Sequence, residues 1–193
     1  MKKKEDLRVI KTKLSLYNGL LELMKEKSFE EIKVSEMCSK SLINRSTFYD
    51  HFGDKNDLFN NLIDDLKNGL ITNLKVTKET SNIHDYFLEV INLLLLEIEN
   101  KKDIFSSLVK NNNSHIARDM FSYATYNTVL SYIEDRYENT TNMKTEDIIN
   151  YYLSGVINIT LCYLQDVKNF NRNNLMNNFR KLIPHTEFFI LKK

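Results

Sequence analysis

Apolar residues recur at steps of three and four along most of the chain, and this period constrains the fold more than any other feature of the sequence. Leu58, Leu62, Leu66 and Leu70, for example, follow one another at steps of four, which places them on one face of a helix. Only one proline and four glycines occur in 193 residues, so little interrupts such helices. The sequence contains no pattern typical of β-strands or of internal repeats. We therefore predict an all-α protein.

The same period sets the expected order of the helices. Ser35, Asn44 and Asp54 are the expected N-caps of the second, third and fourth helices, because their side-chain oxygens can accept hydrogen bonds from free backbone N–H groups. The segments 75–81 and 111–113 are expected to be connections. The predicted helices cover about 5–27, 35–40, 44–52, 55–74, 82–100, 103–110, 114–137, 145–167 and 173–182.

The segment NRSTFYDHF, residues 44–52, has a polar side made of hydrogen-bonding groups instead of the glutamates and lysines of an ordinary solvated face. With the short helix before it and the turn at 41–43, it forms the pattern of a helix-turn-helix. In that motif the second helix enters the major groove of DNA, and its first residues reach the base edges. Arginine bonds guanine, serine or threonine bonds several bases, and a tyrosine hydroxyl reaches phosphates. Phe48 and Phe52, four residues apart, are expected to face inward and anchor the helix.

The longer stretch FEEIKVSEMCSKSLINRSTFYDHFGDKNDLF resembles the DNA-binding domain of TetR-family transcriptional regulators, and the resemblance covers about residues 7–62. The matching positions are Phe29, Ile32, Val34, Thr47, Phe48, Tyr49, His51, Phe52, Lys55 and Leu58. The resemblance implies that Thr47 and Tyr49 touch the phosphate backbone, and that Lys55 holds a phosphate at the start of the fourth helix. It places Arg45 and Ser46 nearest the bases. The candidate DNA-binding residues are Lys33, Ser35, Asn44, Arg45, Ser46, Thr47, Tyr49, His51 and Lys55.

Leu42 departs from the family pattern, which has a glycine in the turn between the two short helices. If the family's backbone is kept, Leu42 must adopt a positive φ at some energetic cost. The alternative is a rearranged turn. Asp50 also departs from the pattern, because it brings a negative charge near the DNA.

The helix at 147–167 is apolar nearly all round, which requires cover on both sides. One of these covers is predicted to be a partner subunit. By resemblance, the later part of the chain is a helical domain that binds a small ligand and dimerises through its last two long helices. We therefore expect a helix-turn-helix DNA-binding domain at 1–60 and a ligand-binding and dimerisation domain at 61–193.

Two sets of residues are the candidates for ligand binding and for dimerisation. The alternative for the aromatic members is plain core, which is the commoner reason for aromatic residues at helical spacing. The candidate ligand-binding residues are Phe87, Ile91, Phe105, Phe121, Tyr123, Tyr126 and Tyr152. The candidate residues of the dimer interface are Tyr151, Gly155, Ile159, Cys162, Tyr163, Leu175 and Phe179.

Composition and motif content argue against several other function classes. The formal net charge of +1 does not suit binding of polyanions over the whole surface, so a nucleic-acid surface must be a local patch. The longest apolar run, about 151–164, is too short to cross a bilayer. Cys38 and Cys162 are expected to be reduced core residues of a cytoplasmic protein. The sequence shows no nucleophile–base pair, metal-ligand spacing or glycine-rich phosphate loop, so we expect neither enzyme activity nor a metal or cofactor.

The sequence therefore predicts a homodimeric transcriptional regulator, a repressor, that binds a palindromic operator in double-stranded DNA and responds to a small-molecule effector. The alternative is a helical protein–protein adaptor that uses the apolar tail at 188–191 and binds no specific DNA.

Overall fold

The computed structural model describes residues 7–75, 80, 82–183 and 188–192. The chain divides into two compact units, Met1–Leu66 and Lys67–Lys193. This division falls inside a helix, whereas the sequence-based boundary lies between residues 60 and 61. The expected helix start at 5–6 and the expected connection at 76–79 and 81 lie outside the described residues.

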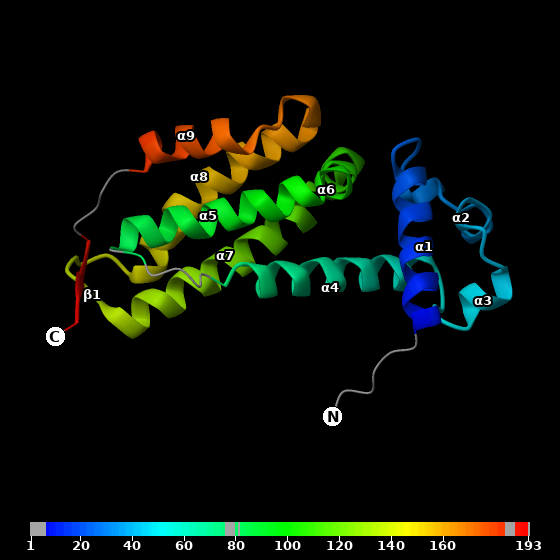
Figure 1. Cartoon of the computed structure of the whole chain (residues 1–193), viewed down its shortest axis with the longest axis horizontal. Coiled ribbons are helices and arrows are strands. Elements are labelled where there is room, and N and C mark those ends of the chain that lie inside the picture. The colour runs from blue at the N-terminus through cyan, green and yellow to red at the C-terminus, as the bar shows by residue number, and fades with distance from the viewer. Residues whose placement is uncertain (1–6, 76–79, 81, 184–187, 193) are drawn as a thin grey trace. The chain divides into compact units, whose positions relative to one another are not determined.

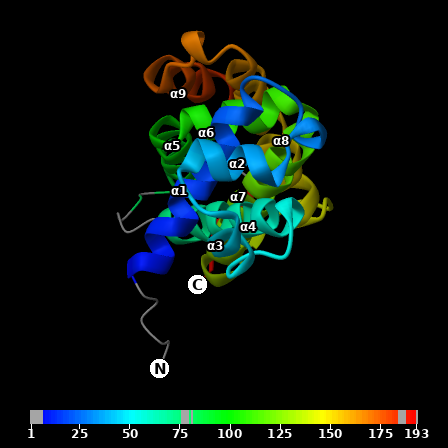
Figure 2. The ribbon, with the colours of Figure 1, turned by 90° about the vertical axis from the view of Figure 1, so that its right-hand side faces the viewer.

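The first unit contains three helices and the beginning of a fourth (Figures 1 and 2). A 3₁₀ turn, η1, joins the first two helices, and α2 packs against both α1 and α3. The elements are α1 (Leu7–Met24), η1 (Phe29–Glu31), α2 (Val34–Ser41), α3 (Arg45–Tyr49) and α4 (Lys55–Asn73).

Side chains fix where these helices begin. Asp54 Oδ1 accepts the Asp57 N–H at 2.8 Å in front of α4, which confirms the predicted cap. The predicted cap at Ser35 is wrong, because α2 begins at Val34 and its N-cap is Lys33. The Glu36 carboxylate accepts the Lys33 N–H at 2.9 Å and so satisfies that orphan donor. Asn44 holds the N-cap position of α3, but its side chain makes no capping hydrogen bond.

The core of the first unit is built from side chains of all four helices. Its fully buried members include Leu16, Leu20, Met37, Phe48 and Leu58. Each such side chain contributes roughly 1.5–3 kcal/mol by leaving water. The Tyr17 hydroxyl donates to the Asp65 carboxylate at 2.9 Å and ties α1 to α4. These contacts hold α3, since a helix of five residues is not stable by itself.

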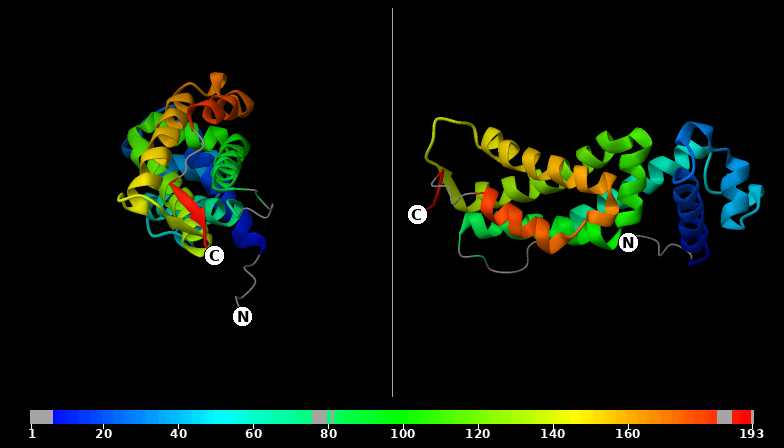
Figure 3. Two further views of the ribbon diagram at one scale, coloured as in Figure 1. Left: turned by 90° about the vertical axis from the view of Figure 1, so that its left-hand side faces the viewer. Right: turned by 90° about the horizontal axis from the view of Figure 1, so that it is seen from above.

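In the second unit the long helices run alongside one another, as the view from above shows best (Figure 3). Helix α5 packs against α7 and α9, and α7 packs along α8. The elements are α5 (Ile83–Asn100), α6 (Lys102–Leu108), the π-helical turn η2 (Val109–Asn113), α7 (Ser114–Arg136), β1 (Tyr137–Asn139), α8 (Thr145–Gln165), the 3₁₀ turn η3 (Val167–Asn169), α9 (Arg172–Leu182) and β2 (Phe189–Leu191).

Apolar packing around α5 forms the core of the second unit. Ile91, Leu94 and Leu95 of α5 are fully buried, and Phe105 and Phe121 pack edge to face with ring centroids 5.1 Å apart. One carboxylate is also buried there: Glu97 pairs with the Lys101 ammonium and accepts a hydrogen bond from the Asn73 amide at 2.9 Å. A buried carboxylate needs such partners, because an unpaired charge is costly inside a protein.

Two features of the second unit differ from the sequence-based expectation. Residues 111–113, expected as a loop, belong to the π-helical turn η2, where the Asn111 amide donates to the Ser107 carbonyl at 2.9 Å. No strand was predicted, yet β1 and β2 pair antiparallel, with Asn139 opposite Phe189. Strands of three residues are too short for an alternating pattern to reveal them. The fold is nevertheless all-α in its architecture.

None of the helices between residues 7 and 183, so far as the structure describes them, is both long enough and apolar enough for a membrane span.

Candidate functional site

The turn before α3 keeps the backbone of a glycine turn even though Leu42 occupies it. Leu42 has φ 57° and ψ 35°, which is the left-handed region, so the first of the two predicted alternatives holds. Its N–H donates hydrogen bonds to the carbonyls of Cys38 and Ser39, and the Ile43 N–H donates to the Cys38 carbonyl at 3.0 Å. These bonds close the end of α2 and set the direction in which α3 leaves. The Leu42 side chain is 92% exposed.

Phe48 of α3 and Phe52, three residues after its end, anchor this segment, as predicted. Phe48 and Phe52 are buried, with ring centroids 5.8 Å apart, and the N–H of Phe52 bonds the Phe48 carbonyl at 2.9 Å. Because these rings face the core, the remaining sides of the helix face outward.

The outward sides carry the candidate DNA-binding residues. Asn44, Arg45 and Ser46 are exposed at the beginning of α3, and Tyr49 is 58% exposed one turn later. Thr47 and His51 are half-buried. The structure therefore brings six of the nine predicted residues onto one short segment, with hydroxyls, a guanidinium, an amide and an imidazole within reach of solvent. Asp50 is exposed beside them, so the predicted negative charge is present.

Lys33 and Ser35 lie at the start of α2. Lys33 is exposed, and Ser35 is half-buried in the first turn. Glu36 lies next to them and accepts a hydrogen bond from the Lys27 ammonium at 2.6 Å, which lowers the pKa of the Glu36 carboxyl. Cys38 is buried, as expected, and burial raises the pKa of its thiol.

Lys55, the expected phosphate contact at the start of α4, bonds backbone carbonyls of its own chain. The Lys55 ammonium donates to the backbone carbonyls of Phe29, Glu30 and Ile32 at 2.9, 2.7 and 3.1 Å. It also lies 4.9 Å from the centre of the Phe29 ring. An ammonium has three N–H donors, and all three are used here. Lys55 therefore joins the start of α4 to the segment after α1, and a phosphate contact would require it to exchange one of these bonds.

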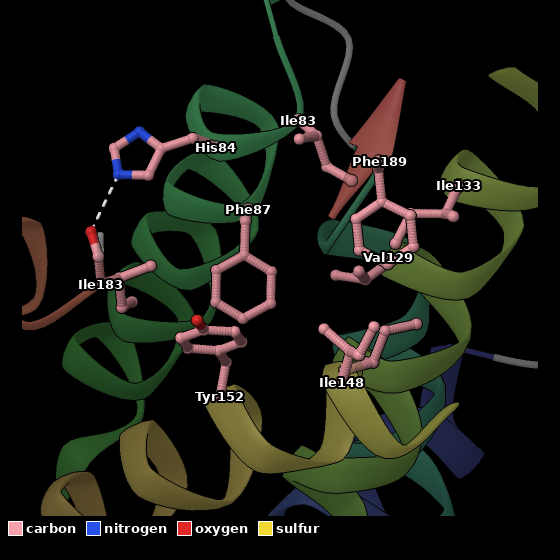
Figure 4. Close-up of a pocket in the computed structure, with 10 residues that line it drawn as sticks. Ile83, His84, Phe87, Val129, Ile133, Ile148, Tyr152, Ile183 and Phe189 are labelled. Carbon is pink, nitrogen blue, oxygen red and sulfur yellow. Dashed lines mark hydrogen bonds between the residues drawn. The ribbon is translucent and has the colours of Figure 1, made fainter. Parts of the chain in front are cut away.

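A pocket in the second unit gathers side chains from α5, α7, α8, the end of α9 and β2 (Figure 4). Its volume is about 40 Å³. Phe87 and Tyr152, two of the predicted ligand-binding residues, line one wall with ring centroids 6.1 Å apart. The lining residues are Ile83, His84, Phe87, Val129, Ile133, Ile148, Ile149, Tyr152, Ile183 and Phe189.

Two polar groups occur at this pocket. Nε2 of His84 lies 3.0 Å from the carbonyl oxygen of Ile183, and Figure 4 shows this ring beside the chamber rather than across it. Tyr152 supplies the hydroxyl, and burial raises the pKa of this phenol above its ordinary value. The phenol is therefore neutral, and able both to donate and to accept, at any pH near 7.

The other predicted ligand-binding residues do not line this pocket. Ile91, Phe105 and Phe121 are buried in the core of the second unit and do not line the pocket. Tyr123 is exposed, with the Lys67 ammonium 4.3 Å from its ring centre, and Tyr126 is half-buried outside the pocket. Most of the actual lining is isoleucine and valine at helix ends together with the tail residue Phe189. Sequence reasoning favoured aromatic residues in mid-helix and gave no reason to combine these ends.

Of the predicted dimer-interface residues, only those of α8 present surface to solvent. Five residues of α8 form an exposed strip, named here the α8 stripe: Tyr151, Ser154, Gly155, Asn158 and Cys162. Ile159 and Tyr163 are half-buried beside it. The helix is therefore covered on one side within its own chain and is not apolar all round.

Three expectations at this surface are wrong. Leu175 and Phe179 of α9 are each only 1% exposed, because α9 packs these side chains against α5 of the same chain, so they present no surface to a partner. Cys162 was expected in the core but is exposed. A helix with both apolar and small polar residues, such as α8, does not reveal from sequence which side its own chain covers.

Among the residues that the structure describes, no three histidines, cysteines or acidic residues gather where a metal ion could be held.

Comparisons with known proteins agree with this arrangement. Residues 16–62 match the sequence model described as bacterial regulatory proteins of the tetR family. YxbF, an uncharacterized HTH-type transcriptional regulator of Bacillus subtilis, is 37% identical over 62 residues. That stretch is 32% of this chain and only 16% of the length of YxbF.

Solved structures resemble the chain over most of its length. A TetR transcriptional regulator from Streptococcus agalactiae has a TM-score of 0.65 at 20% identity, covering 92% of this chain and 96% of that one. The fatty acid degradation regulator FadR from Bacillus halodurans has a TM-score of 0.72 at 9% identity, covering 93% of this chain and 96% of that one. At such identities the likeness establishes the fold alone.

Proposed function

Because the chain belongs to the tetR family of bacterial regulatory proteins and is thus a DNA-binding transcriptional regulator, we propose that it acts as a homodimeric, ligand-responsive repressor on a palindromic operator. Its role is regulatory and not catalytic, and it acts in the cytoplasm, where its DNA lies. The observation that carries the proposal is the arrangement of residues 44–52, named here the α3 segment. Its buried phenylalanines Phe48 and Phe52 hold a short helix whose polar groups lie in solvent.

The residues of this segment divide into two roles by chemistry. Arg45 and Ser46, exposed at the start of α3, are the proposed base readers, since helix-turn-helix proteins place the first residues of the second helix at the base edges. Thr47, Tyr49 and His51 are the proposed phosphate and sugar contacts, because hydroxyl and imidazole groups bond phosphate oxygens. Asn44 and the start of α2, with Lys33 and Ser35, flank them. Lys55 supports this surface from behind through its three carbonyl bonds.

A dimer is needed because one α3 reads only a few base pairs. Two copies read a palindrome when their α3 helices are about 34–36 Å apart, one turn of B-DNA. The α8 stripe supports a two-fold interface, since it is exposed, contains the aromatic Tyr151 and has room for close approach at Gly155.

Regulation is proposed to come from the pocket of the second unit. A ligand there shifts the protein between two states only if it binds them with different affinity, and operator binding then changes by the same factor. A coupling of about 1–3 kcal/mol changes operator affinity roughly 5- to 150-fold. As a repressor, the chain binds the operator without ligand and releases it with ligand.

The adaptor alternative has lost its main support. The tail at 188–191 was its proposed surface, but Phe189 is only 8% exposed and β2 is paired with β1. Ile190 and Leu191 alone remain exposed, which is too little for an adaptor interface.

The test is selection of duplexes by the full chain from a pool of random sequences. We expect a palindromic consensus whose half-site centres lie about 10–10.5 base pairs apart, or a near multiple. Affinity for the selected duplex, measured by fluorescence anisotropy, is expected to fall steeply with salt. Transcription in vitro from a promoter that overlaps the selected site is expected to decrease when the protein is added. Enrichment of no sequence, or of sequences without two-fold symmetry, would overturn the proposal.

A further inference from the structure

The pocket in the second unit is almost wholly apolar. Five isoleucines, one valine and two phenylalanines make up most of its lining, with His84 and Tyr152 as the polar members. Among the described residues that line it, none carries a carboxylate, an ammonium or a guanidinium. A charged molecule in this chamber would lose its water and find no opposite charge, which is costly. The chamber therefore suits an uncharged molecule.

Size is a second constraint on what the pocket can hold. Its volume of about 40 Å³ is well below the ~150 Å³ of an apolar cavity that admits benzene. In the unliganded chain, the chamber has no room for a ring-sized molecule. Any such molecule needs part of the wall to move.

Phe189 belongs to the shortest of the elements that line the pocket. In Figure 4 its ring stands across the chamber from Phe87 and Tyr152, beside Ile133 and Val129. Its backbone belongs to β2, which is joined to the rest of the unit by a ladder of three residue pairs and by flanking bonds from Thr140 N–H to the Phe188 carbonyl (2.9 Å) and Lys192 N–H to the Arg136 carbonyl (2.8 Å). The Lys192 ammonium also donates to the Glu134 carbonyl. A two-stranded ladder of this length is marginal by itself. Apart from Ile183 at the end of α9, the other lining residues belong to the helices α5, α7 and α8.

The orientation of β2 shows that Phe189 is inserted and its neighbours are not. Phe189 is 8% exposed, whereas the next two residues, Ile190 and Leu191, are largely exposed. A single aromatic ring of the tail therefore lines the pocket, beside Val129 and Ile133 of α7.

We propose that this pocket binds a small, uncharged, mainly apolar molecule about the size of one substituted benzene ring, and that the Phe189 ring occupies part of that molecule's place in the unliganded chain. The ligand displaces this ring. The identification of this molecule as the effector rests on the proposed function; the binding itself does not.

The test uses benzyl alcohol as the uncharged probe, with benzoate and benzylammonium as charged molecules of similar shape, and measures binding to the full chain by calorimetry. Phe189→Ala removes the competing ring and enlarges the chamber. We expect benzyl alcohol to bind this variant about 10- to 100-fold more tightly than the unaltered chain, because the cost of displacing a buried phenyl ring is gone. Benzoate and benzylammonium are expected not to bind either form.

Two further variants keep the test decisive. Ile190→Ala, on the exposed side of the same strand, is the matched control and is expected to bind benzyl alcohol like the unaltered chain. Phe189→Leu is used if Phe189→Ala does not fold, and an intermediate gain is expected. Equal affinity of the Phe189 variants and the unaltered chain, or binding of the charged probes as tight as that of benzyl alcohol, overturns the proposal.

Operator affinity measured on the same samples separates the two proposals. Probe binding as expected without binding of any selected duplex supports the pocket and overturns the proposed regulator. Duplex binding with no gain of probe affinity in the Phe189 variants supports the regulator and overturns the assignment of the pocket.

Discussion

At the scale of single residues, the backbone of Leu42 is strained, and no packing of its side chain offsets the energetic cost. Its left-handed backbone crowds the Cβ against the following carbonyl oxygen, and its exposed side chain gains nothing from packing. Relief of this strain is worth about 1–2 kcal/mol, and the added freedom of glycine in the unfolded chain costs about 0.5–1 kcal/mol. We therefore expect Leu42→Gly to raise the melting temperature, followed by far-UV circular dichroism, by about 1–4 °C.

Leu42→Ala is the control for this prediction, because alanine keeps the Cβ and thus the strain. It is expected to leave the melting temperature nearly unchanged. An equal rise in both variants would mean that removal of an exposed apolar side chain, and not the backbone, is responsible.

Two roles of Lys55, structural support through its carbonyl bonds and contact with a DNA phosphate, predict different results when the ammonium is removed. Lys55→Met keeps most of the apolar stem and removes the ammonium, which leaves three carbonyls without their donor. We expect a loss of about 2 kcal/mol in the free energy of unfolding by urea, the scale of hydrogen bonds to a charged group. The slope of log affinity against log salt on a selected duplex should stay the same. A slope reduced by about 1 would instead show that Lys55 neutralises a phosphate.

Arg45 and Tyr49 allow base reading and phosphate contact to be told apart. Arg45→Ala is expected to cost about 1–3 kcal/mol on the selected duplex and to relax discrimination at one base pair. Tyr49→Phe removes only a hydroxyl from an exposed ring and is expected to weaken binding to every duplex by a similar factor. Competition binding with single-base variants of the selected duplex measures both effects. Uniform loss in Arg45→Ala would remove it from the base readers.

At the scale of elements, the α8 stripe is the surface on which the proposed dimer depends. A Cβ built on Gly155 meets no heavy atom within 4 Å, so a large side chain there is compatible with the fold of one chain. We expect Gly155→Arg to leave the far-UV spectrum unchanged, because the fold of each subunit does not need this position, while it converts the protein to a monomer and abolishes operator binding. Sedimentation velocity measures the oligomeric state. Ser131→Arg, on an exposed position of α7, is the control and should remain dimeric. A Gly155→Arg dimer would place the interface elsewhere.

The sequence predicts those features of the elements that depend on residues close together in the chain. Helices with strong period, such as α5 and α4, begin and end within about two residues of their predicted bounds, since local packing and caps such as Asp54 decide them. The inward anchors Phe48 and Phe52 were also predictable, because a spacing of four defines one face of a helix.

The parts that could not be predicted depend on contacts between distant segments. The β1–β2 pair joins residues 137–139 to 189–191 through backbone bonds that leave no mark on the sequence. The bonds of Lys55 to three carbonyls are equally independent of side-chain pattern. Leu175 and Phe179 were assigned to a partner because nothing in an amphipathic helix tells whether its apolar face meets its own chain or another.

At the scale of the whole molecule, assembly and stability are linked. If the functional form is a dimer, the melting temperature depends on protein concentration. Folded chains associate and unfolded chains do not, so a higher concentration shifts the unfolding equilibrium toward the folded dimer. We expect it to rise measurably over a hundredfold increase in the concentration of the unaltered chain and to stay constant for Gly155→Arg. Differential scanning fluorimetry over a dilution series measures this. A constant melting temperature for the unaltered chain would contradict dimerisation over that range.

The nearly neutral charge of the whole chain also has a meaning at this scale. With a formal net charge of +1, the protein has no strong overall attraction to DNA, so discrimination must come from the α3 segment and from its repetition in a second subunit.

The pairing of β1 with β2 has a consequence for the order in which the molecule is assembled. Closing a loop between segments far apart in the chain carries an entropy cost that must be met before the new bonds form, so this pairing is expected late in folding. Until it forms, the chamber between α7 and α8 lacks one wall. A nascent chain thus passes through a stage in which the chamber stands open, and a molecule present at that stage can be enclosed without having to push any side chain aside.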